Sequence, residues 1–222
     1  MSIINHTFGF VFVHVPKSAG TSVVASLSAL TRYRDIESGG AVMSRITQDY
    51  YASRFGIAKH STARELMKVI GAEQWREMTS FGFVRHPVDR LISSFFFLKN
   101  KFRNWPGSEI MDEIETLEAF VDSPLFADGG PGRILRPQVF WLCDGDLRPL
   151  VTEIGRVETI DVDFERMLDR LSLPPEERAS VPPLAVRNKS PRTQPLAPPS
   201  DHVLDAARRF YADDFEAFGY EI

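Results

Sequence analysis

Residues 8–22, FGFVFVHVPKSAGTS, decide the expected fold of this chain. Residues 8–15 are apolar almost throughout, which is typical of a strand buried on both faces of a parallel sheet. Pro16 ends this strand, and the small residues after it lead into a helical pattern. The apolar positions of that pattern are Val23, Val24, Leu27 and Leu30. The segment therefore predicts a strand, a tight loop and a helix.

The same order of elements returns at residues 79–100. Residues 79–84, TSFGFV, form a second strand candidate that ends at Arg85, and Pro87 suits the first turn of the helix that follows. Two such segments predict an α/β fold, a P-loop-like three-layer arrangement in which helices flank a central parallel sheet. Further helices are expected at residues 62–71, 117–121, 164–171 and 201–211, and a strand at 151–157.

Composition is that of an ordinary globular protein, with 222 residues, 43% of them hydrophobic, and a net charge of −4. These values exclude a disordered chain and a collagen, and they argue against nucleic acid as a partner. No repeat or linker divides the chain, so we expect a single domain over residues 1–222. The single cysteine, Cys143, predicts a reducing, cytoplasmic location. The apolar residues 8–15 are too few to span a bilayer, so no integral membrane segment is expected.

The loop after the first strand has the properties of an anion site. Its residues are Lys17, Ser18, Ala19, Gly20, Thr21 and Ser22. Successive backbone N–H groups and the start of a helix converge on the concave side of such a loop. Lys17 adds a full positive charge, so a phosphate or sulfate group is the expected ligand.

The loop differs from the phosphate loop of nucleotide hydrolases and kinases. That motif needs a lysine after its last glycine, whereas Lys17 precedes the single glycine here. A metal-binding acid is also expected at the end of a neighbouring strand, but the second strand ends in Arg85. Asp144 is the one candidate substitute, and Gly145-Asp146 beside it is typical of a turn. A magnesium-dependent kinase or ATPase is therefore disfavoured, and it stays as an alternative.

Two motifs together resemble a known family. HVPKSAGTS, followed by FVRHPVDRLISSFF, is similar to the PAPS-dependent sulfotransferases, especially the carbohydrate group with the heparan and chondroitin enzymes. The resemblance continues through IGRVETIDVDF and DFEAFGY. It implies that 3′-phosphoadenosine 5′-phosphosulfate (PAPS) donates a sulfuryl group in line to a hydroxyl, that of a carbohydrate, leaving PAP as the product. No metal is expected in this scheme.

The resemblance also implies the roles of individual residues. The first motif, residues 17–22, holds the 5′-phosphosulfate, and Arg85 with Ser93, eight residues later, holds the 3′-phosphate. Ser94 is the neighbour most easily confused with Ser93. Residues 179–200 are rich in proline and contain no acid. There Arg187 and Ser190 are expected to contact the 3′-phosphate or the ribose, with a solvated basic loop as the alternative.

Catalysis needs a stabilised leaving group and a base for the acceptor proton. Lys17 is suited to the negative charge that builds on the bridging oxygen. His60, in Ala58-Lys59-His60-Ser61, is the predicted base, as in the related heparan 2-O-sulfotransferases. His14 is interpreted as a core residue of the first strand, and His86 as a residue that orients the loop at Arg85.

Other functions remain open on the sequence alone. One competing enzyme is a small-molecule or lipid sulfotransferase. A competitor of another class is a binding module that keeps the PAP site and has lost catalysis.

Overall fold

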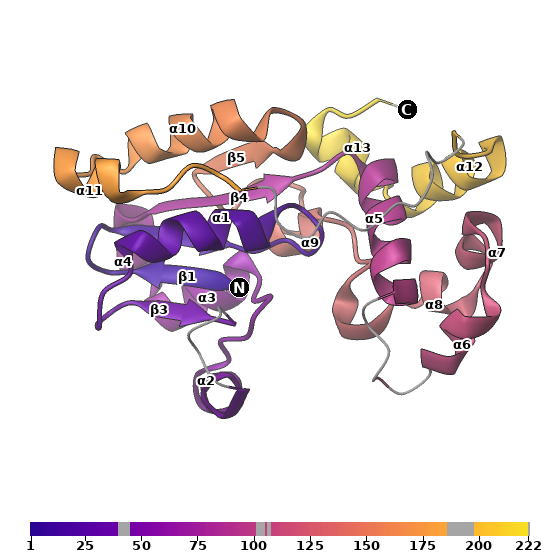
Figure 1. The fold of residues 1–222 in the computed structure, drawn as a ribbon, viewed down its shortest axis with the longest axis horizontal. Coiled ribbons are helices and arrows are strands. Elements are labelled where there is room, and N and C mark those ends of the chain that lie inside the picture. The colour runs from indigo at the N-terminus through magenta and orange to yellow at the C-terminus, as the bar shows by residue number, and fades with distance from the viewer. Residues whose placement is uncertain (40–44, 101–104, 106–107, 186–197, 222) are drawn as a thin grey trace. The chain divides into compact units, whose positions relative to one another are not determined.

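The computed structural model describes residues 1–39, 45–100, 105, 108–185 and 198–221 (Figure 1). Contacts group the chain into two compact units. The first, Met1–Val84 with Gln138–Arg187, is called here the sheet unit. The second, Arg85–Pro137 with Asn188–Ile222, is called the helical unit. A single domain over residues 1–222 stays a prediction beside this division.

The sheet unit contains a five-stranded sheet in the order β3-β1-β2-β4-β5. The strands are β1 (Ser2–Asn5), β2 (Phe10–Val13), β3 (Ile36–Ser38), β4 (Thr79–Val84) and β5 (Glu153–Arg156). β2, β4 and β5 run parallel to one another, whereas β1 is antiparallel to both β2 and β3. The predicted α/β fold with parallel strands flanked by helices is confirmed, and the sheet is mixed because of β1 and β3.

The first strand is shorter than its apolar run. Residues 6–9 form the turn between β1 and β2, and Gly9 adopts a φ of 66° there, so the run is divided between a turn and the strand Phe10–Val13. The hairpin that this turn makes was not predicted. β1 and β3 have only four and three residues, too few for a periodic pattern.

Aromatic side chains alternate along the two central strands. Phe12 pairs with Phe81 across β2 and β4, and their ring centroids are 5.6 Å apart. These rings and their neighbours two residues away share one face of the sheet. They form a buried cluster with α1 (Gly20–Leu27) and α10 (Ile160–Arg170). This cluster is the core of the sheet unit.

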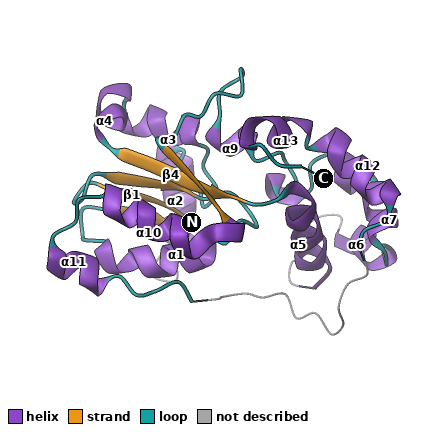
Figure 2. Cartoon of the chain, turned by 90° about the horizontal axis from the view of Figure 1, so that it is seen from above, coloured by secondary structure: helices purple, strands orange, loops and turns teal. Residues whose placement is uncertain are grey.

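Helices cover both faces of the sheet, which gives three layers. α1 and α10 lie on one face, and α3 (Ala63–Ile70) and α4 (Ala72–Glu77) lie on the other (Figure 2). Further helical segments of the sheet unit are η1 (Ser28–Leu30), α2 (Arg45–Phe55), α9 (Val139–Leu142), η3 (Val157–Thr159) and α11 (Pro175–Ser180). α3 begins where a capping box forms, because the Thr62 hydroxyl accepts from the Glu65 amide at 3.1 Å and Glu65 accepts from the Thr62 amide at 2.8 Å.

The helical unit has its own core. Its segments are α5 (Pro87–Asn100), α6 (Ser108–Glu113), α7 (Leu117–Val121), α8 (Pro124–Ala127), η2 (Pro131–Arg133), α12 (Asp201–Phe210) and α13 (Ala212–Phe218). Arg90 is completely buried, and its guanidinium donates to the carbonyl oxygens of Ile134 at 2.9 Å and Arg136 at 2.8 Å. These bonds tie α5 to the segment that precedes Gln138. None of the helices in the described part of the chain has the length and apolar content needed to cross a bilayer.

We expect Gly82→Ala to destabilise the sheet unit. A β-carbon at this position in β4 would lie 2.7 Å from Leu142 Cδ2 and 3.1 Å from the Val13 carbonyl oxygen, so the backbone and α9 must shift. The expected loss is about 1–3 kcal/mol of unfolding free energy, measured by urea denaturation. Gly145→Ala is the matched control, because nothing lies within 4 Å of its added carbon. Equal stability of both variants would contradict the tight packing of β4 on α9.

Candidate functional site

The loop between β2 and α1 has an unusual backbone. Lys17 and Ala19 adopt left-handed φ angles of 66° and 56°, although neither is glycine. Each such residue costs on the order of 1–3 kcal/mol, and the conformation persists only where surrounding contacts enforce it. Left-handed residues at alternate positions turn successive N–H groups toward one side, which is the geometry of an anion-binding nest. The loop has this nest-like backbone geometry, and anion binding by it stays a prediction.

Two buried contacts enforce this conformation. Ser18 is buried, and its hydroxyl donates to Gln138 Oε1 at 3.2 Å. At Gly20, an added β-carbon would lie 1.8 Å from Cδ2 of the His14 ring, so only glycine fits. The sequence gives no signal for Gln138, because it lies 120 residues from Ser18.

The first turn of α1 suits a negatively charged ligand. α1 has no side-chain N-cap and no acid in its first turn. Side-chain caps begin α3, α7 and α8, from Thr62, Thr116 and Ser123, whereas α4, α10 and α12 begin without one, as α1 does. Because helix starts carry unsatisfied donors and a partial positive charge, an uncapped start beside Lys17 favours a phosphate or sulfate group.

His60 lies beside the end of β2, in the same unit as Lys17. Its Nδ1 is 3.2 Å from the carbonyl oxygen of His14, and the two ring centroids are 4.4 Å apart. A carbonyl only accepts, so Nδ1 carries the proton and the lone pair of the neutral ring is on Nε2. The indole of Trp141 donates to the His60 carbonyl oxygen at 3.3 Å. A neutral His60 in this tautomer can accept a proton at Nε2.

His14 is completely enclosed, and its charge state follows from that. Burial lowers its pKa well below 6.5, and the positive charges of the Met1 amine, His60, Lys59 and Lys17 lower it further. The Met1 amine lies 2.6 Å from Nδ1 of this ring. His14 is therefore neutral near pH 7, and its burial agrees with its interpretation as a core residue.

Arg85 and Ser93 belong to the helical unit. Arg85 directly follows β4, Ser93 lies on α5, and both are half-buried. Ser94 is completely buried, and its hydroxyl donates to the carbonyl oxygen of Arg90 at 2.8 Å. This bond occupies the Ser94 hydroxyl within its own helix, and ligand binding by Ser93 stays a prediction.

The neighbour of Arg85 contacts the C-terminal segment. His86 Nε2 donates to the carbonyl oxygen of Glu221 at 2.7 Å. The rings of Phe215 and Tyr220 pack edge-on against its imidazole, with centroids at 5.9 and 5.3 Å. This arrangement suits the orienting role predicted for His86.

Other predicted residues lie elsewhere. Arg187 and Ser190 fall outside the described residues. Asp144 is a turn residue, since its Oδ1 accepts from the amides of Asp146 and Arg148, both at 2.9 Å. Those backbone bonds, first the one from Arg148, lower its pKa. Among the described residues, His, Cys, Asp and Glu side chains form no group of three or more that could hold a metal ion.

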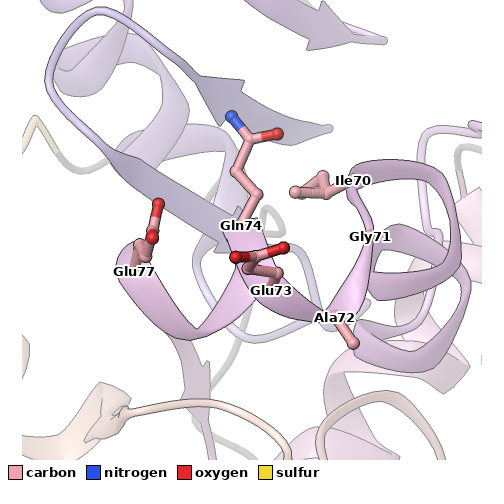
Figure 3. A pocket seen from close by; sticks show the side chains of 6 residues that line it. All are labelled: Ile70, Gly71, Ala72, Glu73, Gln74 and Glu77. Atoms are coloured by element: carbon pink, nitrogen blue, oxygen red, sulfur yellow. The ribbon is translucent and has the colours of Figure 1, made fainter.

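An open depression of about 540 Å³ lies where α3 meets α4. It is lined by Ile70, Gly71, Ala72, Glu73, Gln74 and Glu77, and Figure 3 shows the polar side chains of α4 around it. Its two carboxylates would repel a phosphate or a sulfate group. The depression is therefore unsuited to the ligand that the loop after β2 favours.

Comparison with known proteins identifies one family. The model of the family described as the sulfotransferase family matches residues 1–221. Neither the search of curated proteins nor the search of solved structures found a match.

We expect the stability of the protein to fall in acid because of His14. Its pKa is well below 6.5 in the folded state, so below about pH 6.5 the unfolded chain binds a proton that the folded chain does not. Above about pH 6.5, His14 should not change the unfolding free energy. Below that pH, the unfolding free energy should decrease as pH falls, by up to about 1.4 kcal/mol per pH unit. Urea denaturation between about pH 7 and pH 5 measures the slope.

The control separates His14 from other titrating groups. His14→Asn should flatten the slope, whereas Val11→Ala, at a buried position of β2 without a titratable group, should lower stability and leave the slope unchanged. An unchanged slope in His14→Asn would contradict a neutral buried imidazole.

Proposed function

The chain belongs to the sulfotransferase family, and on this basis we propose that it transfers the sulfuryl group of PAPS to an acceptor hydroxyl, with a carbohydrate as the acceptor. The observation that carries the proposal is the loop after β2. Its left-handed residues Lys17 and Ala19 lead into a helix without a side-chain cap. Such a loop provides backbone donors for a phosphosulfate without a metal ion.

Lys17 and the loop amides act on the 5′ end of the donor. The backbone N–H groups of Ala19, Gly20 and Thr21 bind the 5′-phosphate, and the side chain of Ser18 holds the loop. The Ser22 amide instead donates to the Ala19 carbonyl oxygen at 2.9 Å. As the bond between sulfur and the bridging oxygen breaks, its electron pair stays on that oxygen and PAP departs. The Lys17 ammonium stabilises the new charge.

His60 receives the proton of the acceptor. The acceptor oxygen forms the new bond to sulfur, and its proton passes to Nε2, which holds the lone pair when Nδ1 donates to the His14 carbonyl oxygen. In the whole step, one sulfuryl group moves from PAPS to the acceptor oxygen, and one proton moves from the acceptor to His60. No oxidant or metal enters this balance.

Arg85 and Ser93 bind the 3′-phosphate in this proposal. A guanidinium offers a fixed fork of donors that matches a phosphate, and a hydroxyl adds a further bond. Arg187 and Ser190 are kept as further contacts to the 3′-phosphate or ribose. These assignments come from the family resemblance and the half-burial of Arg85 and Ser93.

The turn role of Asp144 bears on the competing kinase. Its Oδ1 is occupied by two backbone amides, which is the arrangement of a turn residue and not of a metal ligand at a strand end.

The single cysteine, Cys143, forms no disulfide within the chain, and this suits a cytoplasmic protein. We expect that the protein does not bind nucleic acid and that its function does not involve an integral membrane segment.

The first test is transfer of radiolabelled sulfate from PAPS to a panel of saccharides, phenols and lipids. We expect transfer to a saccharide, and we expect Lys17→Ala to lower kcat by about 100- to 1,000-fold because one donor to the leaving oxygen is lost. Lys68→Ala, at an exposed position on α3, is the matched control and should keep the wild-type rate. Transfer to a phenol or lipid alone would replace the carbohydrate acceptor, and PAP binding without any transfer would favour a binding module.

Ser93 and Ser94 provide a second, internally controlled test. Ser93→Ala should weaken PAP binding by about 10- to 100-fold, the effect of one hydrogen bond to a charged group. Ser94→Ala should keep the affinity within about twofold, because its hydroxyl is used by Arg90. Isothermal titration with PAP, and with ATP and magnesium, measures both. Tighter binding of ATP with magnesium than of PAP would instead support the kinase.

A further inference from the structure

His14 lies between the candidate base and the phosphate loop. Its ring centroid is 4.4 Å from that of His60. On another side of the ring, a β-carbon at residue 20 would lie 1.8 Å from Cδ2 and 2.0 Å from Nε2. The imidazole is therefore in close contact with both His60 and the first residue of α1.

The backbone of His14 contacts His60 as well. Its carbonyl oxygen accepts the hydrogen bond from His60 Nδ1 at 3.2 Å. One residue thus holds the neighbouring imidazole at two points, at the ring face and at Nδ1. Two contacts fix both the tilt of the His60 ring and the nitrogen that carries its proton.

His14 is excluded as the base itself by its surroundings. It has only 5% of its surface exposed, and its Nδ1 lies 2.6 Å from the Met1 amine. Because Nε2 is on the side of Gly20, neither ring nitrogen faces solvent. A neutral ring in this place also avoids repelling His60 when His60 takes up a proton.

We propose that His14 is a positioning residue, whose ring and carbonyl group orient the His60 imidazole and keep it at a fixed separation from the start of α1. This inference rests on the proposed function, in which His60 is the general base. It assigns to His14 a role beyond filling the core. A small displacement of a general base lowers the reaction rate by a large factor. Loss of the His14 contacts is therefore expected to lower kcat.

A double-mutant cycle tests whether His14 acts through His60. His14→Ala should lower kcat by about tenfold or more. In the His60→Ala background, the same change should alter the remaining rate by less than about twofold, because its target is already absent. Multiplicative effects in the double variant would overturn the inference.

The tautomer of His60 gives a readout that needs no activity. Nitrogen-15 NMR of the wild-type imidazoles should show His60 protonated at Nδ1, and His14→Ala should shift it toward a mixture of tautomers. If the alanine variant does not fold, His14→Asn replaces it in both the double-mutant cycle and the NMR measurement. The asparagine keeps a polar group near the place of Nδ1. An unchanged His60 tautomer in the folded variant would overturn the inference.

Val11→Ala is the matched control. Val11 is a completely buried residue of β2, three positions before His14, and its truncation should lower stability without changing kcat or the His60 tautomer. Equal effects from Val11→Ala would indicate general loosening of β2 and would overturn the inference. If the wild type fails to transfer sulfate from PAPS, the proposed function fails, while the tautomer measurement still tests the contact itself.

Discussion

Gly20 carries no side chain because the His14 imidazole fills the place of a β-carbon, 1.8 Å from the ring carbon Cδ2. This contact brings the end of β2 against the first residue of α1, so the residues between them must turn tightly. Lys17 and Ala19 adopt left-handed φ angles of 66° and 56° there. The cost of such angles is offset by buried neighbours, among them Ser18 and Gln138. The loop between β2 and α1 owes its shape to these contacts.

The candidate base depends on the same contact. His60 lies 46 residues after His14 in the sequence, yet it is held by the carbonyl group and ring of His14. Trp141 from α9 fixes its backbone through a hydrogen bond to its carbonyl oxygen. A cationic loop and an imidazole with its lone pair on Nε2 are thereby kept in one unit of the chain. This combination is what in-line transfer to a hydroxyl requires.

Charge is distributed unevenly, which the total of −4 conceals. Lys17 and Lys59 both lower the pKa of His14, so cationic groups gather around the end of β2. Acids are found elsewhere in the same unit, as at Glu73 and Glu77 beside the open depression. A mildly acidic chain is therefore compatible with an anionic ligand, because the local field near the loop is set by the nearest charges.

The sequence by itself determined the two strand–loop–helix segments, the place of the loop after β2 and the helix start at Pro87, because apolar runs, small residues and proline act on the backbone locally. It also indicated Lys17, Arg85 and Ser93 through two motifs, and His60 through its place before a helix. Only the tertiary structure decided the antiparallel edge formed by β1 and β3. It also decided the hydrogen bond from Ser18 to Gln138 and the pairing of His60 with His14, across 120 and 46 residues of chain. Such partners are selected by packing in three dimensions, which no local pattern encodes.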